Sequence, residues 1–310
     1  MESIPPPLGS HYGLVWSFIR AKTRPISPRT LLALAAFLFS TGGVAIKMVS
    51  FPAWQIASIR SGVAFVVLLL LFPKAKSGWT TGSALVGVFY AATMTTFVLA
   101  NRLTTSAQAV FIQATSPIYL AILAPLILSE RTPRRDLLFL IPIITGLGLF
   151  LTGEQRTFNT APNPHLGNLL ALVSGFCGAL TTIGLRWLAK SNRSVDSSYS
   201  ALAIGNLMTL AAGAMVSLPW NSGGIADWSI VGLMGIFQIA LPYVIVARVL
   251  SRVRALEVAL VLLLEPVINP ILSFLVHREA PGVGVIIGGT IVVGASAIRA
   301  WLAARQPLNP

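Results

Sequence analysis

The chain has 310 residues, of which 55% are hydrophobic and 10% are charged, and its mean hydropathy is +0.80. A soluble domain carries about a quarter charged residues, so this composition excludes a soluble enzyme, a nucleic-acid reader or a disordered protein as the whole chain. It predicts a helical membrane protein that crosses the bilayer several times. The net charge of +13 does not indicate a nucleic-acid partner, because the basic residues lie between apolar runs rather than in one patch.

The sequence contains ten runs that are long and apolar enough to cross a bilayer, which takes roughly 20 residues of helix. They are, in chain order, residues 31–50, 54–72, 80–100, 104–128, 136–152, 166–189, 197–217, 228–247, 255–276 and 282–301. The expected fold is therefore an all-α integral membrane protein with ten transmembrane helices. The apolar stretch within residues 1–30 is too short to span, so we expect this segment to form a cytoplasmic tail, like residues 302–310.

The basic residues predict the orientation of these ten spans. Most of the 22 Lys and Arg residues fall on one side of the predicted membrane, whereas Arg102, Arg156 and Arg278 fall on the other. Cytoplasmic loops carry the excess of Lys and Arg in membrane proteins. We therefore expect both termini in the cytoplasm, and we interpret the positive charge as a determinant of topology.

The two halves of the chain share a short pattern. A Ser-Pro pair at 116–117 is followed by Glu130, and a Glu-Pro pair at 265–266 is followed by Glu279, with proline and glutamate 13 positions apart both times. Five helices in each half would insert the second half with the opposite orientation, as an inverted repeat. We therefore expect repeats at residues 31–152 and 167–301, joined by an outer linker at 153–166. Chance similarity between apolar sequences is the alternative explanation of the pattern.

Several segments in a fixed order give the chain a family resemblance. They are ThrGlyGlyValAlaIleLys (41–47), SerIleArgSerGly (58–62), ThrSerAlaGlnAlaValPheIleGlnAlaThrSerPro (105–117), SerGluArg (129–131), LeuGluProValIleAsnPro (264–270) and ArgGlu (278–279). With this order and spacing, the chain resembles the drug/metabolite transporter superfamily, in particular its ten-helix EamA-type exporters. The resemblance implies two inverted five-helix bundles around a central cavity. It also implies proton-linked or facilitated export of small metabolites, often amino acids.

Within that superfamily, length and bacterial-style topology are most similar to amino-acid exporters such as the aromatic amino acid exporter group. This resemblance implies a bacterial inner membrane location. The chain departs from the family pattern at PheSerThrGly (39–42), where many relatives carry a Trp beside the Gly, and at 253–254, where a Val-Arg pair replaces small residues. These departures leave the substrate open.

Glu265 is the most informative polar residue within the spans. It lies about 16 Å of helix from Arg254, which puts it near the middle of the bilayer. Desolvation disfavours the charged form of a carboxyl group, so Glu265 could take up and release a proton and is our candidate for proton coupling. The alternative is a protonated or hydrogen-bonded glutamate that only closes a helix contact. Pro266 and Pro117 are the predicted hinges, because proline interrupts the helical hydrogen bonds.

Two basic residues near the outer ends of their spans, Lys47 and Arg60, could form a cationic mouth that meets a substrate carboxylate as it leaves. The alternative is that their side chains extend to the headgroups, which is the better explanation for Lys47.

Uncharged polar residues at mid-span are the remaining candidates for substrate contact, namely Tyr90, Gln113, Asn206 and Gln238. Trp54, Tyr90 and Tyr243 would supply rigid aromatic walls. Hydrogen bonding between helices is the alternative explanation for any one of the four.

The sequence lacks a P-loop and the common hydrolase motifs, so we predict neither an enzyme nor a bound cofactor or metal ion. We predict a secondary transporter that exports small metabolites, most plausibly aromatic or other neutral amino acids, by alternating access. Its partners would be the small-molecule substrate and membrane lipid, with no nucleic acid, and it would be a monomer or weak dimer. The alternatives are a nucleotide-sugar or phosphorylated-metabolite exchanger, and a non-transporting sensor or assembly protein.

Overall fold

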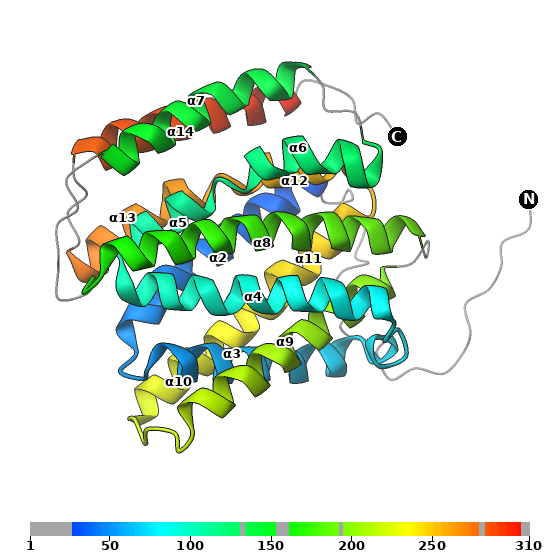
Figure 1. Ribbon diagram of the computed structural model, residues 1–310, viewed down its shortest axis with the longest axis vertical. Helices are drawn as coiled ribbons and strands as arrows, with labels where there is room; N and C mark the ends of the chain where they lie inside the picture. Colours follow the sequence, from blue (N-terminus) through cyan, green and yellow to red (C-terminus); the bar gives the residue numbers. More distant parts are fainter. Residues whose placement is uncertain (1–26, 131–133, 153–160, 192–194, 279–282, 305–310) are drawn as a thin grey trace, which may run out of the picture.

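The computed structural model describes residues 27–130, 134–152, 161–191, 195–278 and 283–304, and these ranges contain helices and no β-strand (Figure 1). The predicted all-α membrane fold is confirmed. Within these ranges, eight helices or consecutive helix groups are long and apolar enough to cross a membrane. Most of the two predicted tails, and residues 153–160 of the predicted linker, fall outside the described residues.

The first half of the chain begins with a capped helix. Ser27 accepts a hydrogen bond from the Thr30 amide, and Pro28 takes the first helical position, where its missing N–H costs nothing. The helix therefore starts slightly before the predicted span. The elements of this half are α2 (Pro28–Met48), α3 (Ala53–Leu71), the 3₁₀ turn η1 (Pro73–Lys76), α4 (Thr81–Leu103), α5 (Ser106–Gln113), α6 (Ser116–Leu128) and α7 (Arg134–Thr152).

The second half contains one span with an unusual centre. Between α10 and α11 the backbone forms a π-helical segment, η2, so the predicted run 228–247 becomes a longer span from Ile225 to Leu250. π-Helical turns inside α-helices are frequently found at functional sites. The elements of this half are α8 (Pro164–Ser191), α9 (Asp196–Ser217), α10 (Ile225–Leu233), η2 (Met234–Ala240), α11 (Leu241–Leu250), α12 (Ala255–Leu262), α13 (Glu265–His277) and α14 (Val283–Ala304).

Two of the predicted spans are broken in their middle. Residues 104–128 form α5 and α6, and residues 255–276 fall within α12 and α13, with 8 and 13 residues in the paired helices both times. Pro117 and Pro266 each stand just inside the helix that follows the break, where proline can start a helix but cannot continue one. Both broken spans also end on a left-handed residue with a φ of 55°, Ser129 and Arg278.

Small residues let the central helices pack closely. A Cβ on Gly184 of α8 would lie 2.4 Å from a Val86 methyl group of α4, and one on Gly205 of α9 would lie 2.8 Å from the carbonyl of Gly87 in α4. Close approach through small residues is the usual way in which membrane helices associate. In Figure 1, α7 and α14 lie side by side at one edge of the bundle, and α3, α9 and α10 lie at the opposite edge.

Candidate functional site

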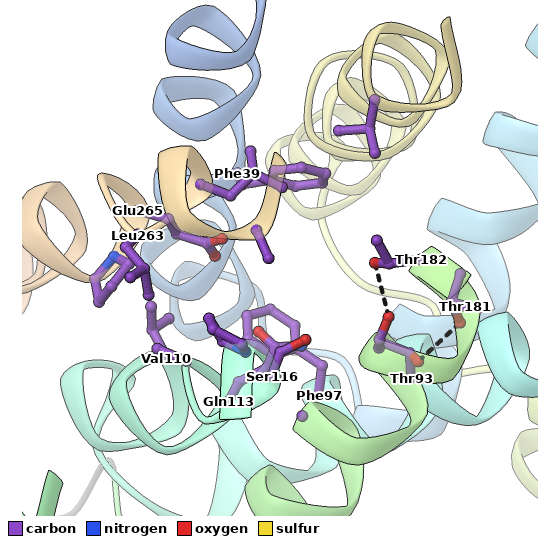
Figure 2. Close-up of a pocket in the computed structure, with 18 of the residues that line it drawn as sticks. Phe39, Thr93, Phe97, Val110, Gln113, Ser116, Thr181, Thr182, Leu263 and Glu265 are labelled. Carbon is purple, nitrogen blue, oxygen red and sulfur yellow. Dashed lines mark hydrogen bonds between the residues drawn. The ribbon is translucent and has the colours of Figure 1, made fainter. Parts of the chain in front are cut away.

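A central cavity of about 120 Å³ lies against both helix breaks (Figure 2). Its walls come from α2, α4, α8, η2 and α11 and from the residues around the two breaks. A water molecule needs only about 10–15 Å³ of such space, so the cavity has room for several waters or a small polar ligand. The two broken spans therefore meet at an internal space instead of a packed core.

Glu265 points its carboxyl group into this cavity (Figure 2). It is the first residue of α13, and its backbone carbonyl lies 3.4 Å from the Ser40 hydroxyl of α2. Among the described residues, its carboxyl oxygens have no hydrogen-bond or ion-pair partner, and it is the one Asp, Glu, Lys, Arg or His side chain in the cavity lining. The carboxyl group is thus available to a proton or to a ligand.

Hydroxyl groups cover the wall opposite Glu265. Thr93 of α4 and Thr181 and Thr182 of α8 line the cavity there, and Figure 2 shows them across the pocket from Glu265. The Thr93 and Thr181 hydroxyls lie 3.5 Å apart, and each also donates to a carbonyl one turn earlier in its own helix. These threonines are not among the site residues predicted from the sequence, although Thr and Gly recur at helical spacing from residue 175 to 182.

Gln113 connects the first break to α8. Its Nε2 donates to the Ser174 hydroxyl at 2.8 Å, and Ser174 donates to the Thr93 carbonyl at 3.1 Å. Gly175 allows this approach, because a Cβ there would lie 2.9 Å from the Gln113 carbonyl. Gln113 therefore lines the cavity, as a substrate contact would, and also joins two helices, as the alternative interpretation expects.

Gln238 lines the cavity from the π-helical segment and accepts a hydrogen bond from Arg60 behind it. The Arg60 Nη1 lies 2.9 Å from Gln238 Oε1, and its Nη2 donates to the Met94 carbonyl at 3.1 Å. Arg60 itself is fully buried and is not among the lining residues. Arg60 therefore does not form the outer cationic mouth that the sequence predicts, because α4 and η2 enclose its side chain.

An aromatic cluster forms the floor of the cavity. Tyr243 lines the cavity and makes edge-to-face contacts with Phe39, at a centroid distance of 5.0 Å, and with Tyr90, at 4.8 Å. Tyr90 is buried behind Tyr243, and its hydroxyl accepts a hydrogen bond from Asn206 Nδ2 at 3.2 Å. Tyr90 and Asn206 thus support the wall from outside the cavity.

Of the remaining predicted site residues, two lie at the helix breaks and two lie away from the cavity. Pro117 and Pro266 both line the cavity at the two breaks. Lys47 donates to the Thr104 carbonyl at 2.9 Å, and Trp54 sits in the first turn of α3, with its carbonyl facing Gly213 of α9. Lys47 and Trp54 do not line the cavity.

Within the described ranges, no three His, Cys, Asp or Glu side chains are close enough to hold a metal ion.

The model of the EamA-like transporter family matches residues 28–152 and residues 165–300. The chain belongs to this family. The two matched ranges each contain one broken span, so each half of this EamA-like transporter contributes one helix break to the cavity.

Curated relatives of this EamA-like transporter carry transporter names. The pseudopaline exporter CntI of Pseudomonas aeruginosa is 23% identical over 275 residues, which cover 86% of this chain and 93% of that protein. The human solute carrier family 35 member G1 is 25% identical over 288 residues, covering 86% of this chain and 78% of the relative. A solved crystal structure with 17% identity superimposes with a TM-score of 0.68 over 89% of this chain and 98% of that one, which shows a shared fold.

Proposed function

We propose that this EamA-like protein is a secondary transporter that exports small metabolites, with neutral and aromatic amino acids as its cargo. The observation that carries the proposal is the unpartnered carboxyl group of Glu265 in a cavity that lies against both helix breaks. Binding sites of secondary transporters lie near the midplane, where discontinuous helices meet. The substrate would enter from the cytoplasm and leave after the halves rock about Pro117 and Pro266.

The lining of the cavity supports amino acids over phosphorylated cargo. A phosphate dianion would need several basic side chains, and the described lining residues include no Lys or Arg. Hydroxyl groups, amides, aromatic rings and one carboxyl group suit a neutral or zwitterionic molecule. Glu265 would bind a proton or a cationic group, and would thereby couple export to the proton gradient.

The proposed location is the bacterial inner membrane, with both termini in the cytoplasm. The distribution of Lys and Arg supports this orientation, because the end of the bundle near Lys74, Lys190 and Arg252 would face the cytoplasm. The free energy for export would come from the proton or substrate gradient.

The proposal is tested with the full-length protein in liposomes. Vesicles are preloaded with one unlabelled amino acid, and uptake of the labelled amino acid is measured with and without a pH gradient, against protein-free vesicles. We expect counterflow for phenylalanine, tyrosine, tryptophan or leucine. Absence of counterflow for every amino acid would contradict the proposed cargo, and counterflow of a sugar phosphate instead would favour the exchanger.

A further inference from the structure

We propose that the side-chain amide of Gln238 binds an anionic oxygen of the cargo, and that Arg60 positions and polarises this amide from behind. This inference rests on the proposed function and deepens it, because it assigns a carboxylate to the transported molecule. The cargo would place its carboxylate at Gln238, on the π-helical segment.

Arg60 is a buried cation without a counter-ion. Its side chain has 0% exposure, and it forms no ion pair with any carboxylate among the described residues. Its contacts are all neutral acceptors, namely Gln238 Oε1 and the carbonyl and sulfur of Met94, and its Nε–H has no partner in the described part of the chain. A buried charge without compensation is costly in a membrane protein, so Arg60 favours negative charge in its surroundings.

The contact with Arg60 fixes which end of the Gln238 amide faces it. A guanidinium group only donates hydrogen bonds, so the atom 2.9 Å from Nη1 must be the amide oxygen. The opposite end of the same amide is the Nε2 group, whose two N–H donors are not used by Arg60. Nε2 has no hydrogen-bond partner among the described residues.

The backbone around Gln238 leaves space for this orientation. A Cβ on Gly42 of α2 would lie 2.4 Å from Nε2, so a glycine is required for the amide to lie there. A Cβ on Gly235 of η2 would lie 2.6 Å from the Arg60 carbonyl of α3. The absence of a side chain at Gly235 therefore lets η2 pack close to α3. Oε1 is held by Arg60, Nε2 lies beside Gly42 of α2, and the Gln238 side chain is part of the cavity wall.

Hydrogen bonds in a chain polarise one another, so donation from the Arg60 cation to Oε1 makes the Nε2–H groups stronger donors. Stronger donors favour a negatively charged acceptor over a neutral one. Glu265 lines the same cavity with an unpartnered carboxyl group, so it can meet the ammonium group of the same molecule. The two residues together select a cargo that carries one charge of each sign.

The substitution Gln238→Glu separates this role from a structural one. A carboxylate at 238 still accepts from Arg60, and even forms an ion pair with it, but it offers no N–H and repels an anion. We expect the thermal stability in detergent to be kept or raised, and the KM for amino-acid counterflow to rise by about tenfold or more. If the only role of Gln238 were to accept the hydrogen bond from Arg60, the same variant would keep the wild-type KM, and that result would overturn the inference.

The control is Gln108→Glu, which also buries a carboxylate in place of a glutamine acceptor. Gln108 accepts from the Thr104 and Thr105 hydroxyls and does not line the cavity. We expect this variant to keep the wild-type KM. Gly42→Ala is a second test, since it keeps every polar group but its Cβ would lie 2.4 to 3.0 Å from Nε2, Cδ and Cγ of Gln238 and would displace this side chain. We expect the KM of Gly42→Ala to rise as well.

A wild-type experiment makes the test independent of any variant's folding. Phenylalanine and leucine are compared with phenethylamine and isopentylamine, their counterparts without the carboxylate, as labelled cargo and as competitors. We expect the amines to compete at least about tenfold more weakly than the amino acids. Equal transport of amino acids and amines would overturn the inference and leave the proposed function intact. Transport of the amines alone, or of none of the four, would count against both.

Discussion

Ser116 and Glu265 occupy matching positions, because each is the first residue of the 13-residue helix that follows a break and each lines the cavity. The residue after each is a proline, and the two helices end on the same left-handed turn. The backbone at the two breaks is thus nearly equivalent, while the chemistry differs. The first break carries a hydroxyl group at this position and the second carries a carboxyl group, so of these two residues only Glu265 has a side chain suited to proton exchange.

Glu265→Gln should uncouple transport from the pH gradient. The amide keeps the size of the side chain but cannot release a proton, so stimulation by a pH gradient should be lost, while counterflow at equal pH should continue with a higher KM because the charge that meets the ammonium group is gone. Proteoliposome counterflow at equal and unequal pH measures both. Ser116→Ala is the matched control and should keep the stimulation. Gradient-stimulated transport by Glu265→Gln at the wild-type level would remove the carboxyl group from the coupling step.

Gly43→Ala should destabilise the contact between α2 and the two broken spans. A Cβ at this position would lie 2.0 Å from the Ser106 hydroxyl and 2.8 Å from Asn269 Nδ2, which are themselves joined through a 2.9 Å hydrogen bond from Ser106 Oγ to Asn269 Oδ1. Overpacking of this kind costs about 1–3 kcal/mol. Thermal unfolding in detergent measures the loss. Gly232→Ala, where a Cβ meets nothing within 4 Å, is the control and should keep or raise the stability.

Eight of the ten predicted spans correspond to described helices or helix groups that are long and apolar enough to cross a membrane, and the two predicted prolines stand at the two breaks. Apolar length is read directly from composition, and Pro117 and Pro266 cannot continue a helix. The predicted depth of Arg60 in the membrane did not indicate that its side chain is buried between helices. Counting residues from the end of a span gives a depth but not the helices that cover the side chain, and here α4 and η2 enclose it completely.

The division between lining and supporting residues also depended on packing that the sequence does not encode locally. Tyr90 and Tyr243 looked equivalent as aromatic walls, yet only Tyr243 reaches the cavity, because Tyr90 packs behind its ring. The threonines of α4 and α8 were overlooked because Thr is common in membrane helices and bonds to its own backbone. Their function as a wall follows only from the crossing of the two helices.

Glu130→Gln should weaken the packing of α6 against α8. The Glu130 carboxylate lies 2.8 Å from Arg186 Nε, and the side chains are only 9% and 11% exposed. Removing one partner from a buried pair leaves the other uncompensated, so we expect a loss of about 3 kcal/mol. The measurement is thermal or denaturant unfolding in detergent.

The Arg29–Glu257 pair provides the comparison for this prediction. It is longer, at 3.6 Å, and its side chains are 25% and 22% exposed. Glu257→Gln should therefore cost only about 0.2–1 kcal/mol. Equal losses for Glu130→Gln and Glu257→Gln would show that burial does not strengthen the Glu130–Arg186 pair.

Tyr90→Phe should lower stability without changing the recognition of cargo. The substitution removes the hydroxyl that accepts from Asn206 at 3.2 Å, which costs about 0.5–1.5 kcal/mol, but keeps the ring that packs edge-on against Tyr243. The KM for counterflow should therefore remain that of the wild type while the melting temperature falls. Tyr90→Leu removes the ring as well, so Tyr243 loses its support and the KM should rise. A higher KM for Tyr90→Phe would instead mean that the Tyr90 hydroxyl contacts the cargo, in a state where Tyr243 has moved aside.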